Sequence, residues 1–288
     1  MSHKITLAHS PDADDIFMYF AIKFGWIDTK DYSFENIGLD IETLNVEALK
    51  GTYDVSAISF GLYPFIKDDY ALLRTAVSFG DGYGPKLIRQ KNKKLKRNFK
   101  VALSGKYTTN AMLFRIYYPN ARPIYMDFLE IEKAVVDGVV DAGVLIHESI
   151  LDFDDSLEVE KELWDIWLEL AKEKLPLPLG GMAIRRSIPL NRAIDIEEIL
   201  IDGVKVANEK KDELCKKLEE DNLVRIGDKM LTKYLDMYAS DESVSLSPIQ
   251  LKALDRLYQI GLENGVYSDI IKTEDYLIPT EYKALRES

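Results

Sequence analysis

His147 is the residue of this sequence best suited to move a proton. It follows an apolar run from Ala142 to Ile146 that predicts a buried strand, and the chain holds only three histidines. An imidazole exchanges protons near neutral pH because its ordinary pKa is about 6.5. We therefore expect His147 to project from the end of its strand into a ligand cleft and to act as a general base. The structural alternative is a histidine at the rim of the core. Glu148 is poorly placed to orient it, because neighbours in a strand point to opposite faces.

The stretch "SGKYTTN", residues 104–110, could hold an anion. It places Thr108, Thr109 and Asn110 at the predicted start of a helix, where free backbone N–H groups attract negative charge. A Walker loop would need a second glycine and a Lys-Ser/Thr pair, which this stretch lacks. A carboxylate or a polarised oxygen fits better than a triphosphate, and capping of the helix by Thr108 is the structural alternative.

Three carboxylates gather in "SPDADDIF", at Asp12, Asp14 and Asp15. Aspartates at a helix start cap free N–H groups and complement the helix dipole, so we interpret them as capping residues and expect no metal. One of these carboxylates could still bind a sugar hydroxyl. Ser10, Ser59 and Ser104 share a simpler property with His147, since each follows a predicted strand.

Composition limits the choice of partner. The chain has 288 residues, a net charge of −12 and a pI near 4.9, which argue against nucleic acid or an anionic membrane and favour a small-molecule substrate. The basic run from Lys91 to Lys100 has no interleaved aromatic residues and is interpreted as a solvated connection. Cys215 is the only cysteine. No signal peptide or membrane span is recognisable, so we expect a cytoplasmic protein without a cofactor; the oligomeric state stays open.

Strand and helix patterns alternate along the first 185 residues, which predicts an α/β fold. Two segments repeat one plan. "EALKGTYDVSAISF" and "KAVVDGVVDAGVLIH" both run from a helix through Gly-x-x-Asp into a strand, with Gly51 and Asp54 in the first and Gly138 and Asp141 in the second. We also expect "LDIETL", residues 39–44, to be a strand. The repeat indicates two similar lobes.

The chain leaves the first lobe and returns to it. We predict a first lobe from residues 1–89 and 180–288 and an inserted second lobe from 90–179. The remainder predicts three helices, at about 195–220, 222–239 and 247–264, packed on the first lobe. Ligands of such sheets bind beyond the carboxyl ends of the strands, so a cleft between the lobes is the expected site.

Five stretches together resemble one family. They are "AGVLIHES" at 142–149, "LPLPLGGMAIRR" at 175–186, "TLN" at 43–45, "ISF" at 58–60 and "GKYTT" at 105–109. Their order is similar to that of the 1,4-dihydroxy-6-naphthoate synthases of the futalosine route to menaquinone, over residues 5–186 and more loosely beyond. The family's opening Ser-Pro-Cys-Pro-Asn-Asp is kept here only at Ser10, Pro11 and Asp15.

The resemblance implies a two-lobed, type II periplasmic-binding-protein-like fold with a helical C-terminal region. It implies a lyase that converts cyclic dehypoxanthine futalosine to 1,4-dihydroxy-6-naphthoate, with His147 as the proton acceptor. The substrate would be held by the residues of two strand and helix ends and by two further polar residues: Ala57, Ile58, Ser59, Thr108, Thr109, Asn110, Asn45 and Asp15. The alternatives are a chorismate dehydratase of the same pathway and a non-catalytic small-molecule-binding protein.

Overall fold

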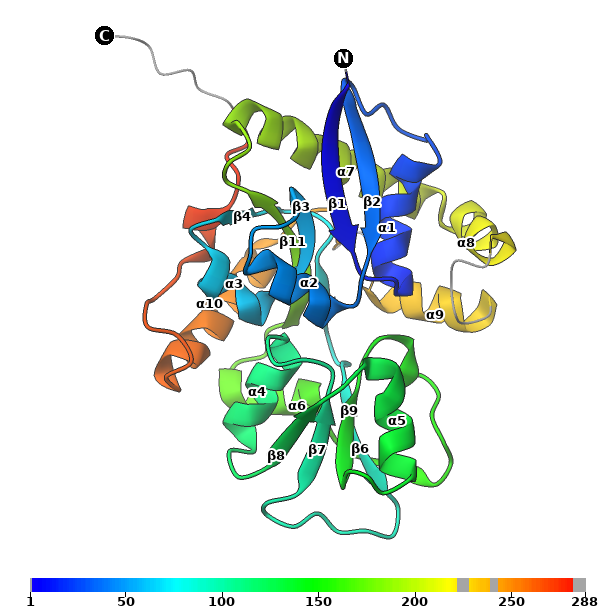
Figure 1. The fold of residues 1–288 in the computed structure, drawn as a ribbon, viewed down its shortest axis with the longest axis vertical. Helices are drawn as coiled ribbons and strands as arrows, with labels where there is room; N and C mark the ends of the chain where they lie inside the picture. Colours follow the sequence, from blue (N-terminus) through cyan, green and yellow to red (C-terminus); the bar gives the residue numbers. More distant parts are fainter. Residues whose placement is uncertain (1, 222–227, 239–242, 282–288) are drawn as a thin grey trace.

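Two β-sheets, one above the other, make up the body of the molecule (Figure 1). The computed structural model describes residues 2–221, 228–238 and 243–281. The first sheet has the strand order β2-β1-β3-β11-β4, with β5 also paired to β11, and the second has the order β10-β6-β9-β7-β8. The chain is therefore a mixed α/β protein, as the alternating patterns predict.

The first sheet combines parallel and antiparallel pairs. Its strands are β1 (His3–His9), β2 (Tyr32–Gly38), β3 (Val55–Ser59), β4 (Tyr70–Leu72), β5 (Ser78–Gly80) and β11 (Leu177–Arg185). β1 lies parallel to β2 and β3, whereas β11 runs antiparallel to β3, β4 and β5. Every residue of β3 is buried, which explains its unbroken apolar and small-residue sequence.

The second sheet repeats this mixture. It contains β6 (Lys86–Gln90), β7 (Lys100–Leu103), β8 (Arg122–Tyr125), β9 (Ala142–Leu145) and β10 (Leu157–Glu162). β7 lies parallel to β8 and β9, and β6 runs antiparallel to β9 and β10. The chain changes sheets before β6 and again before β11, a few residues earlier than the proposed lobe boundaries at 90 and 180. The division into lobes at those residues stays a prediction.

One predicted strand is wrong. Residues 39–44 do not form a strand, because β2 ends at Gly38 and helix α2 (Ile41–Ala48) begins three residues later. The Asp40 carboxylate starts this helix by accepting the N–H groups of Glu42 and Thr43, both at 3.1 Å. The N-cap therefore outweighs the β-branched residues that suggested a strand.

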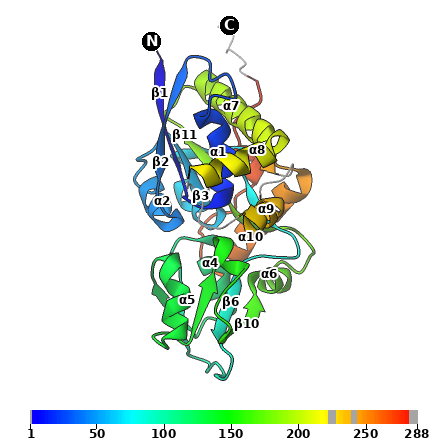
Figure 2. The same cartoon turned by 90° about the vertical axis from the view of Figure 1, so that its right-hand side faces the viewer.

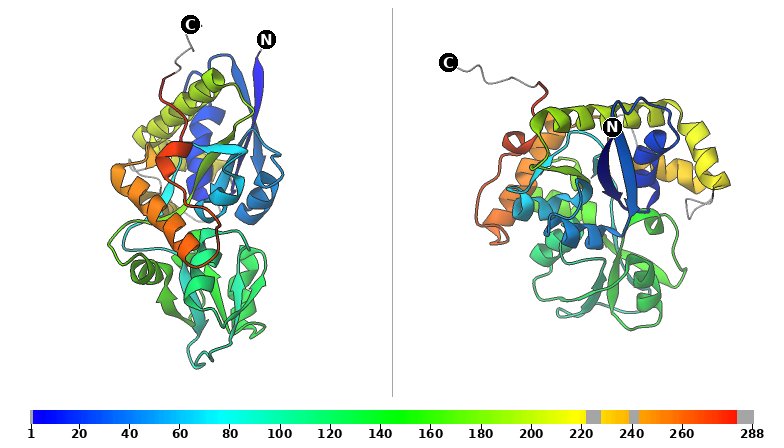
Figure 3. Two further views of the ribbon diagram at one scale, coloured as in Figure 1. Left: turned by 90° about the vertical axis from the view of Figure 1, so that its left-hand side faces the viewer. Right: turned by 45° about the horizontal axis from the view of Figure 1, so that its top comes forward.

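The other helices cover the two sheets and fill the space between them. Their bounds are α1 (Ala13–Lys23), η1 (Phe60–Leu62), α3 (Tyr63–Ile66), α4 (Thr109–Tyr117), α5 (Phe128–Val136), η2 (His147–Ile150), α6 (Leu163–Ala171), α7 (Leu190–Glu209), α8 (Lys211–Glu220), α9 (Asp228–Tyr238), α10 (Pro248–Glu263) and η4 (Thr273–Tyr276). Helices α7, α8 and α9 gather around α1 beside the first sheet, as Figures 2 and 3 show. No helix among the described residues is long and apolar enough to cross a bilayer.

The C-terminal helices differ in part from the prediction. The helix expected at about 195–220 is two helices, α7 and α8, which meet at Lys210 with a φ of −110°. This break lets Leu214, Cys215 and Leu218 turn their side chains into the core. The helix expected at 222–239 falls partly outside the described residues, and its described part is α9. The third helix, α10, matches its prediction within a residue at each end.

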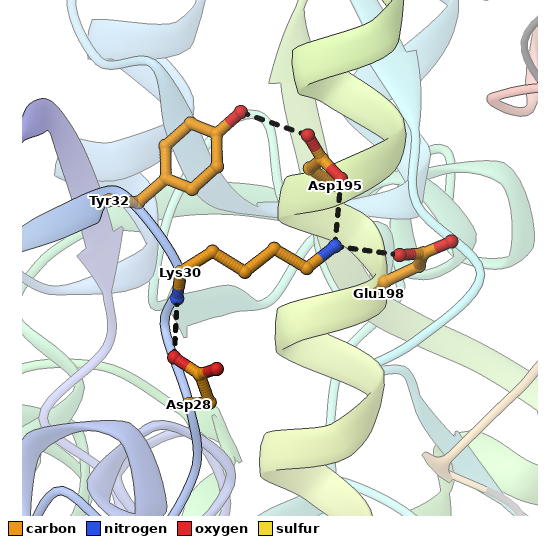
Figure 4. Close-up of polar contacts among 5 residues, drawn as sticks. All are labelled: Asp28, Lys30, Tyr32, Asp195 and Glu198. Atoms are coloured by element: carbon orange, nitrogen blue, oxygen red, sulfur yellow. Dashed lines mark hydrogen bonds and ion pairs between the residues drawn. The ribbon is translucent and has the colours of Figure 1, made fainter.

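A polar cluster ties α7 to the loop before β2 (Figure 4). The Lys30 ammonium group lies 2.8 Å from the Asp195 carboxylate and 3.0 Å from that of Glu198. The Tyr32 hydroxyl donates to Asp195 at 3.2 Å, and the Lys30 N–H donates to the Asp28 carboxylate at 2.8 Å. Because these groups are partly exposed, each ion pair contributes at most about 1 kcal/mol. The cluster mainly fixes where α7 crosses the edge of the first sheet.

Candidate active site

A cleft lies where strand ends of the two sheets meet. Its empty space, open solvent included, is about 680 Å³. It is lined by four polar residues at or just beyond strand ends: Ser10, Ser59, Ser104 and His147. The rest of its wall comes from both sheets and comprises Asp12, Asp15, Ile41, Ala57, Ile58, Ala76, Ser78, Pro85, Thr108, Thr109, Asn110, Ile146, Leu179, Gly180, Gly181 and Tyr234. Polar groups from two separate sheets thus converge on one space.

His147 lies just beyond the second sheet. β9 ends at Leu145, and His147 is the first residue of η2 with a left-handed φ of +53°. A non-glycine residue in this region is uncommon, so the surrounding structure must hold it there. The ring packs edge-on against Phe128, with the centroids 5.0 Å apart. The backbone turn directs the imidazole away from the line of the strand.

Asp12 is the partner of His147. Its Oδ2 lies 2.8 Å from His147 Nδ1, with 3% of the Asp12 side chain and 16% of the His147 side chain exposed. Asp12 is also the N-cap of α1, since its Oδ1 accepts the N–H of Asp15 at 3.3 Å. The capping interpretation of Asp12 is therefore right but incomplete. This one carboxylate joins the start of α1, after the first sheet, to η2 of the second.

Three titratable groups, His147, Asp12 and Asp15, lie together in this part of the cleft wall, and burial and charge affect them differently. Burial by itself would lower the pKa of His147, but the charge of Asp12, its hydrogen bond, and the charges of Glu148 and Asp15 together raise it. Burial and the neighbouring Asp12 charge raise the pKa of Asp15 to about 8, although the Ser10 N–H donates to it at 2.8 Å. Near neutral pH Asp15 is therefore mostly protonated, and Asp12 is the residue whose carboxyl oxygen faces the imidazole.

Asn45 lies behind Ser59, outside the lining of the cleft. It is fully buried on α2 and does not line the cleft. Its Nδ2 donates to Ser59 Oγ at 3.0 Å, and its Oδ1 accepts the Ser59 N–H at 2.9 Å. Because Ser59 Oγ already accepts one bond, its own hydrogen is left to donate towards a ligand. Asn45 therefore orients Ser59, whereas we had expected it to contact the substrate directly.

Thr109 joins the two sheets at the floor of the cleft. Its hydroxyl accepts the Gly61 N–H at 2.9 Å and donates to the Leu179 carbonyl at 2.7 Å. Leu179 belongs to β11 of the first sheet and Gly61 to η1, which directly follows β3, whereas Thr109 begins α4 beside the second sheet. Thr108 caps the same helix, with its hydroxyl accepting the Ala111 N–H at 3.1 Å. The side chains of both threonines are thus engaged, and what this helix start offers a ligand is backbone N–H groups and Asn110.

Three buried polar atoms in the cleft wall have no hydrogen-bond partner in the described part of the chain. They are Ser10 Oγ, Asn110 Oδ1 and His147 Nε2. Leaving a buried polar atom unpaired costs about 1–3 kcal/mol, so such atoms are rare unless a ligand completes them. Two of the three can accept a hydrogen bond and the hydroxyl can do either. The site is therefore suited to a ligand that carries hydroxyl or N–H donors.

The two glycines Gly180 and Gly181 were missed as site residues. A Cβ at Gly180 would lie 2.9 Å from the Ile58 carbonyl oxygen, and one at Gly181 would lie 2.7 Å from the Phe60 ring. They allow β11 to pass close to β3 where both border the cleft. The Gly-Gly pair in "LPLPLGGMAIRR" is the sequence feature that could have identified them as site residues. On β3, Ser59 and Ile58 lie opposite this pair, and Ala57 lies opposite Met182.

Comparison with known proteins gives this site a context. A family model described as menaquinone biosynthesis matches residues 5–263. The 1,4-dihydroxy-6-naphtoate synthase of Thermus thermophilus is 31% identical over 193 residues, which are 66% of this chain and 70% of that protein. The synthase of Streptomyces coelicolor is 31% identical over 194 residues, covering 64% and 67%.

Solved structures show the same architecture. A protein from Archaeoglobus fulgidus is 34% identical, covers 92% of this chain and 99% of its own, and superposes with a TM-score of 0.84. The periplasmic aliphatic sulphonate binding protein SsuA of Escherichia coli, at 11% identity, covers 100% and 96% with a TM-score of 0.68. The predicted two-lobed, periplasmic-binding-protein-like fold of type II with C-terminal helices is confirmed, and so is the resemblance to the synthases. From its sequence over nearly its whole length, this chain belongs to the menaquinone biosynthesis family.

Proposed function

We propose that this chain is a 1,4-dihydroxy-6-naphthoate synthase, a carbon–carbon lyase that acts on cyclic dehypoxanthine futalosine with His147 as the general base. The observation that carries the proposal is the state of the imidazole. Its Nδ1 is held by a carboxylate at 2.8 Å, while its Nε2, in the wall of the cleft, is without a partner among the described residues. The names of the Thermus and Streptomyces relatives support this choice of reaction.

The proposed reaction breaks a carbon–carbon bond and makes a ring aromatic. A base must remove a proton from the substrate, and hydrogen-bond donors must stabilise the oxyanion that develops. His147 Nε2 is the proposed proton acceptor. The proposed donors are the first-turn N–H groups of α4 at Thr109 and Asn110 and the hydroxyl of Ser59. The Ser59 N–H is excluded from this role, because it donates to Asn45.

The substrate would contact both sheets. We propose that Ala57, Ile58 and Ser59 bind it from the first sheet, and that Thr108, Thr109 and Asn110 bind it from the second. Asp15, mostly protonated near neutral pH, would donate a hydrogen bond to a substrate oxygen. Asn45 would act only through Ser59. No cofactor and no metal enter this scheme, and we further propose that the protein works in the cytoplasm, which cell fractionation can test.

The decisive experiment supplies the purified chain with cyclic dehypoxanthine futalosine and, separately, with chorismate. Release of 1,4-dihydroxy-6-naphthoate from the first supports the proposal. Dehydration of chorismate, or tight binding without turnover, would replace it with one of the two alternatives. His147→Asn is the companion variant: it should remain folded and lower the rate by about 10²–10⁴-fold, the usual contribution of a positioned acid–base group. Near wild-type turnover by a folded variant would remove His147 from the mechanism.

A further inference from the structure

We propose that Asp12 is a positioning residue that fixes the tautomer of His147, so that the nitrogen at the cleft is the one able to accept a proton. The inference rests on the proposed role of His147 as a base. A carboxylate only accepts hydrogen bonds, so the contact of 2.8 Å between Asp12 Oδ2 and His147 Nδ1 requires a hydrogen on Nδ1. In a neutral imidazole the proton is then absent from Nε2, which leaves Nε2 basic.

Each carboxylate oxygen of Asp12 contacts a different hydrogen-bond partner, and this makes the residue hard to replace. Oδ2 faces His147, whereas Oδ1 accepts the Asp15 N–H at the start of α1. The position at the helix N-terminus stabilises a negative charge, and 3% exposure of the side chain protects the pair from water. An amide offers one acceptor and one donor, so it cannot serve both partners in the same way.

The substitution Asp12→Asn therefore has a specific consequence. The helix cap needs an acceptor opposite the Asp15 N–H, which keeps the amide oxygen at the Oδ1 position. The amide nitrogen then faces His147 and donates to Nδ1, so the ring proton moves to Nε2. The base is present but carries its proton at the wrong atom. We expect the rate to fall by about 10²–10⁴-fold, as if the base itself were lost.

Three charged or titratable groups besides His147 bear on its protonation. Asp12 and Glu148 favour the imidazolium ion, Asp15 does so only when it is ionised, and Phe128 packs against the ring without a charge. Removing the Asp12 charge therefore lowers the pKa of His147. Any activity that Asp12→Asn retains should show its acid limb at a lower pH than the wild type. A residue with a purely structural role in the α1 cap would leave that limb where it is.

Nuclear magnetic resonance can read the tautomer directly. The chain has only three histidines, so ¹⁵N-labelled imidazoles can be assigned with His147→Asn as the reference. In the wild type, above the pKa of His147, we expect the proton on Nδ1, and in Asp12→Asn on Nε2. The readout is independent of turnover, so it tests the tautomer claim even if the proposed reaction is wrong.

Two variants separate orientation from capping. Asp12→Ser keeps a good helix cap but is too short to serve His147, so it should melt close to the wild type and lose the rate. Asp127→Asn changes the cap of α5, where the carboxylate accepts the Leu129 N–H at 2.9 Å, and should leave the rate unchanged. If Asp12→Asn, Asp12→Ser and Asp127→Asn all lost activity in proportion to their loss of melting temperature, this would count against the inference.

A double variant completes the test. If Asp12 acts only through His147, then Asp12→Asn combined with His147→Asn should be no slower than His147→Asn alone. Additive losses would show that Asp12 has its own separate role and would overturn the inference. If His147→Asn is fully active, the proposed function fails instead. If His147→Asn is inactive while Asp12→Asn keeps the wild-type rate, pH profile and tautomer, the function stands and the positioning role falls.

Discussion

Replacing Thr109 by valine should destabilise the protein far more than the change of one atom suggests. The Thr109 hydroxyl accepts the Gly61 N–H at 2.9 Å and donates to the Leu179 carbonyl at 2.7 Å. Only 1% of the surface of Thr109 is exposed. Valine has the same shape but can do neither. The buried Gly61 N–H and the half-buried Leu179 carbonyl would then each lose this partner.

The expected loss follows from these two groups. An unsatisfied buried N–H costs about 1–3 kcal/mol and the half-buried carbonyl, which water can reach, costs less, so we expect the free energy of unfolding to fall by about 1–4 kcal/mol. With a slope of about 2–4 °C per kcal/mol, which applies to chains of roughly 150–250 residues, the melting temperature should fall by roughly 2–16 °C. The matched control is Thr109→Ser, which keeps the hydroxyl and loses one methyl group, at about 1 kcal/mol.

Thermal melts followed by circular dichroism would measure both variants under one set of conditions. We expect the order wild type, serine variant, valine variant, with the larger step between the last two. A valine variant that melts with the serine variant would refute the reasoning, because it would show that the two backbone groups find other partners or do not need them. In that case the hydroxyl of Thr109 would not be what holds α4 against Gly61 and Leu179.

Further predictions concern protonation, support and metals. The rate should rise with pH through a midpoint above about 6.5, because a base must be neutral and the surroundings raise the pKa of His147; a pH profile that falls from 6 to 8 would contradict this. The folded state binds the Asp15 proton more tightly than the unfolded chain, so the stability that this group contributes is full at acid pH and is lost as pH rises towards about 8. The free energy of unfolding of Asp15→Asn should therefore rise relative to that of the wild type between pH 5 and 8, by at most about 1.4 kcal/mol per pH unit, and thermal melts at several pH values would measure this. Asn45→Leu should raise KM and cost about 1–3 kcal/mol, because Ser59 loses its two partners; equal KM in a folded variant would exclude a supporting role. Dialysis against a chelator should leave turnover unchanged, and a loss restored by a divalent cation would show that our scheme lacks a metal.

Much of this fold is readable from the sequence because its strands are short, buried and bounded by clear turns. β3 and β9 are buried throughout, and β1 and β7 are buried towards their C-terminal ends, where each run reaches the polar residues that line the cleft. Residues 39–44 failed because their alternating pattern is shared by a strand and by one side of a short helix. The capping bonds of Asp40, which decide between them, are local but invisible to a pattern.

The pairing of Asp12 with His147 could not be predicted from the sequence. The two residues lie far apart in the chain and belong to different halves of the molecule, and the capping role of Asp12 already accounted for its presence. Asn45 shows a different limit, since a matching motif suggested substrate contact and the fold places the residue behind Ser59, outside the lining of the cleft; direct contact with the substrate stays a prediction. Sequence patterns find which residues gather near strand ends, but only packing decides which of them face the space between.

The position of β11 has a consequence for synthesis. The second sheet is built from one continuous segment, Lys86 to Glu162, so all its strands have been synthesised before β11 is made. The first sheet cannot be completed until then, because β11 is the strand that joins β3 to β4. The N-terminal strands must therefore wait, with the apolar edge of β3 exposed, while the later segment folds. A released fragment ending near residue 170 should therefore present a protected second sheet and a protease-sensitive N-terminal segment.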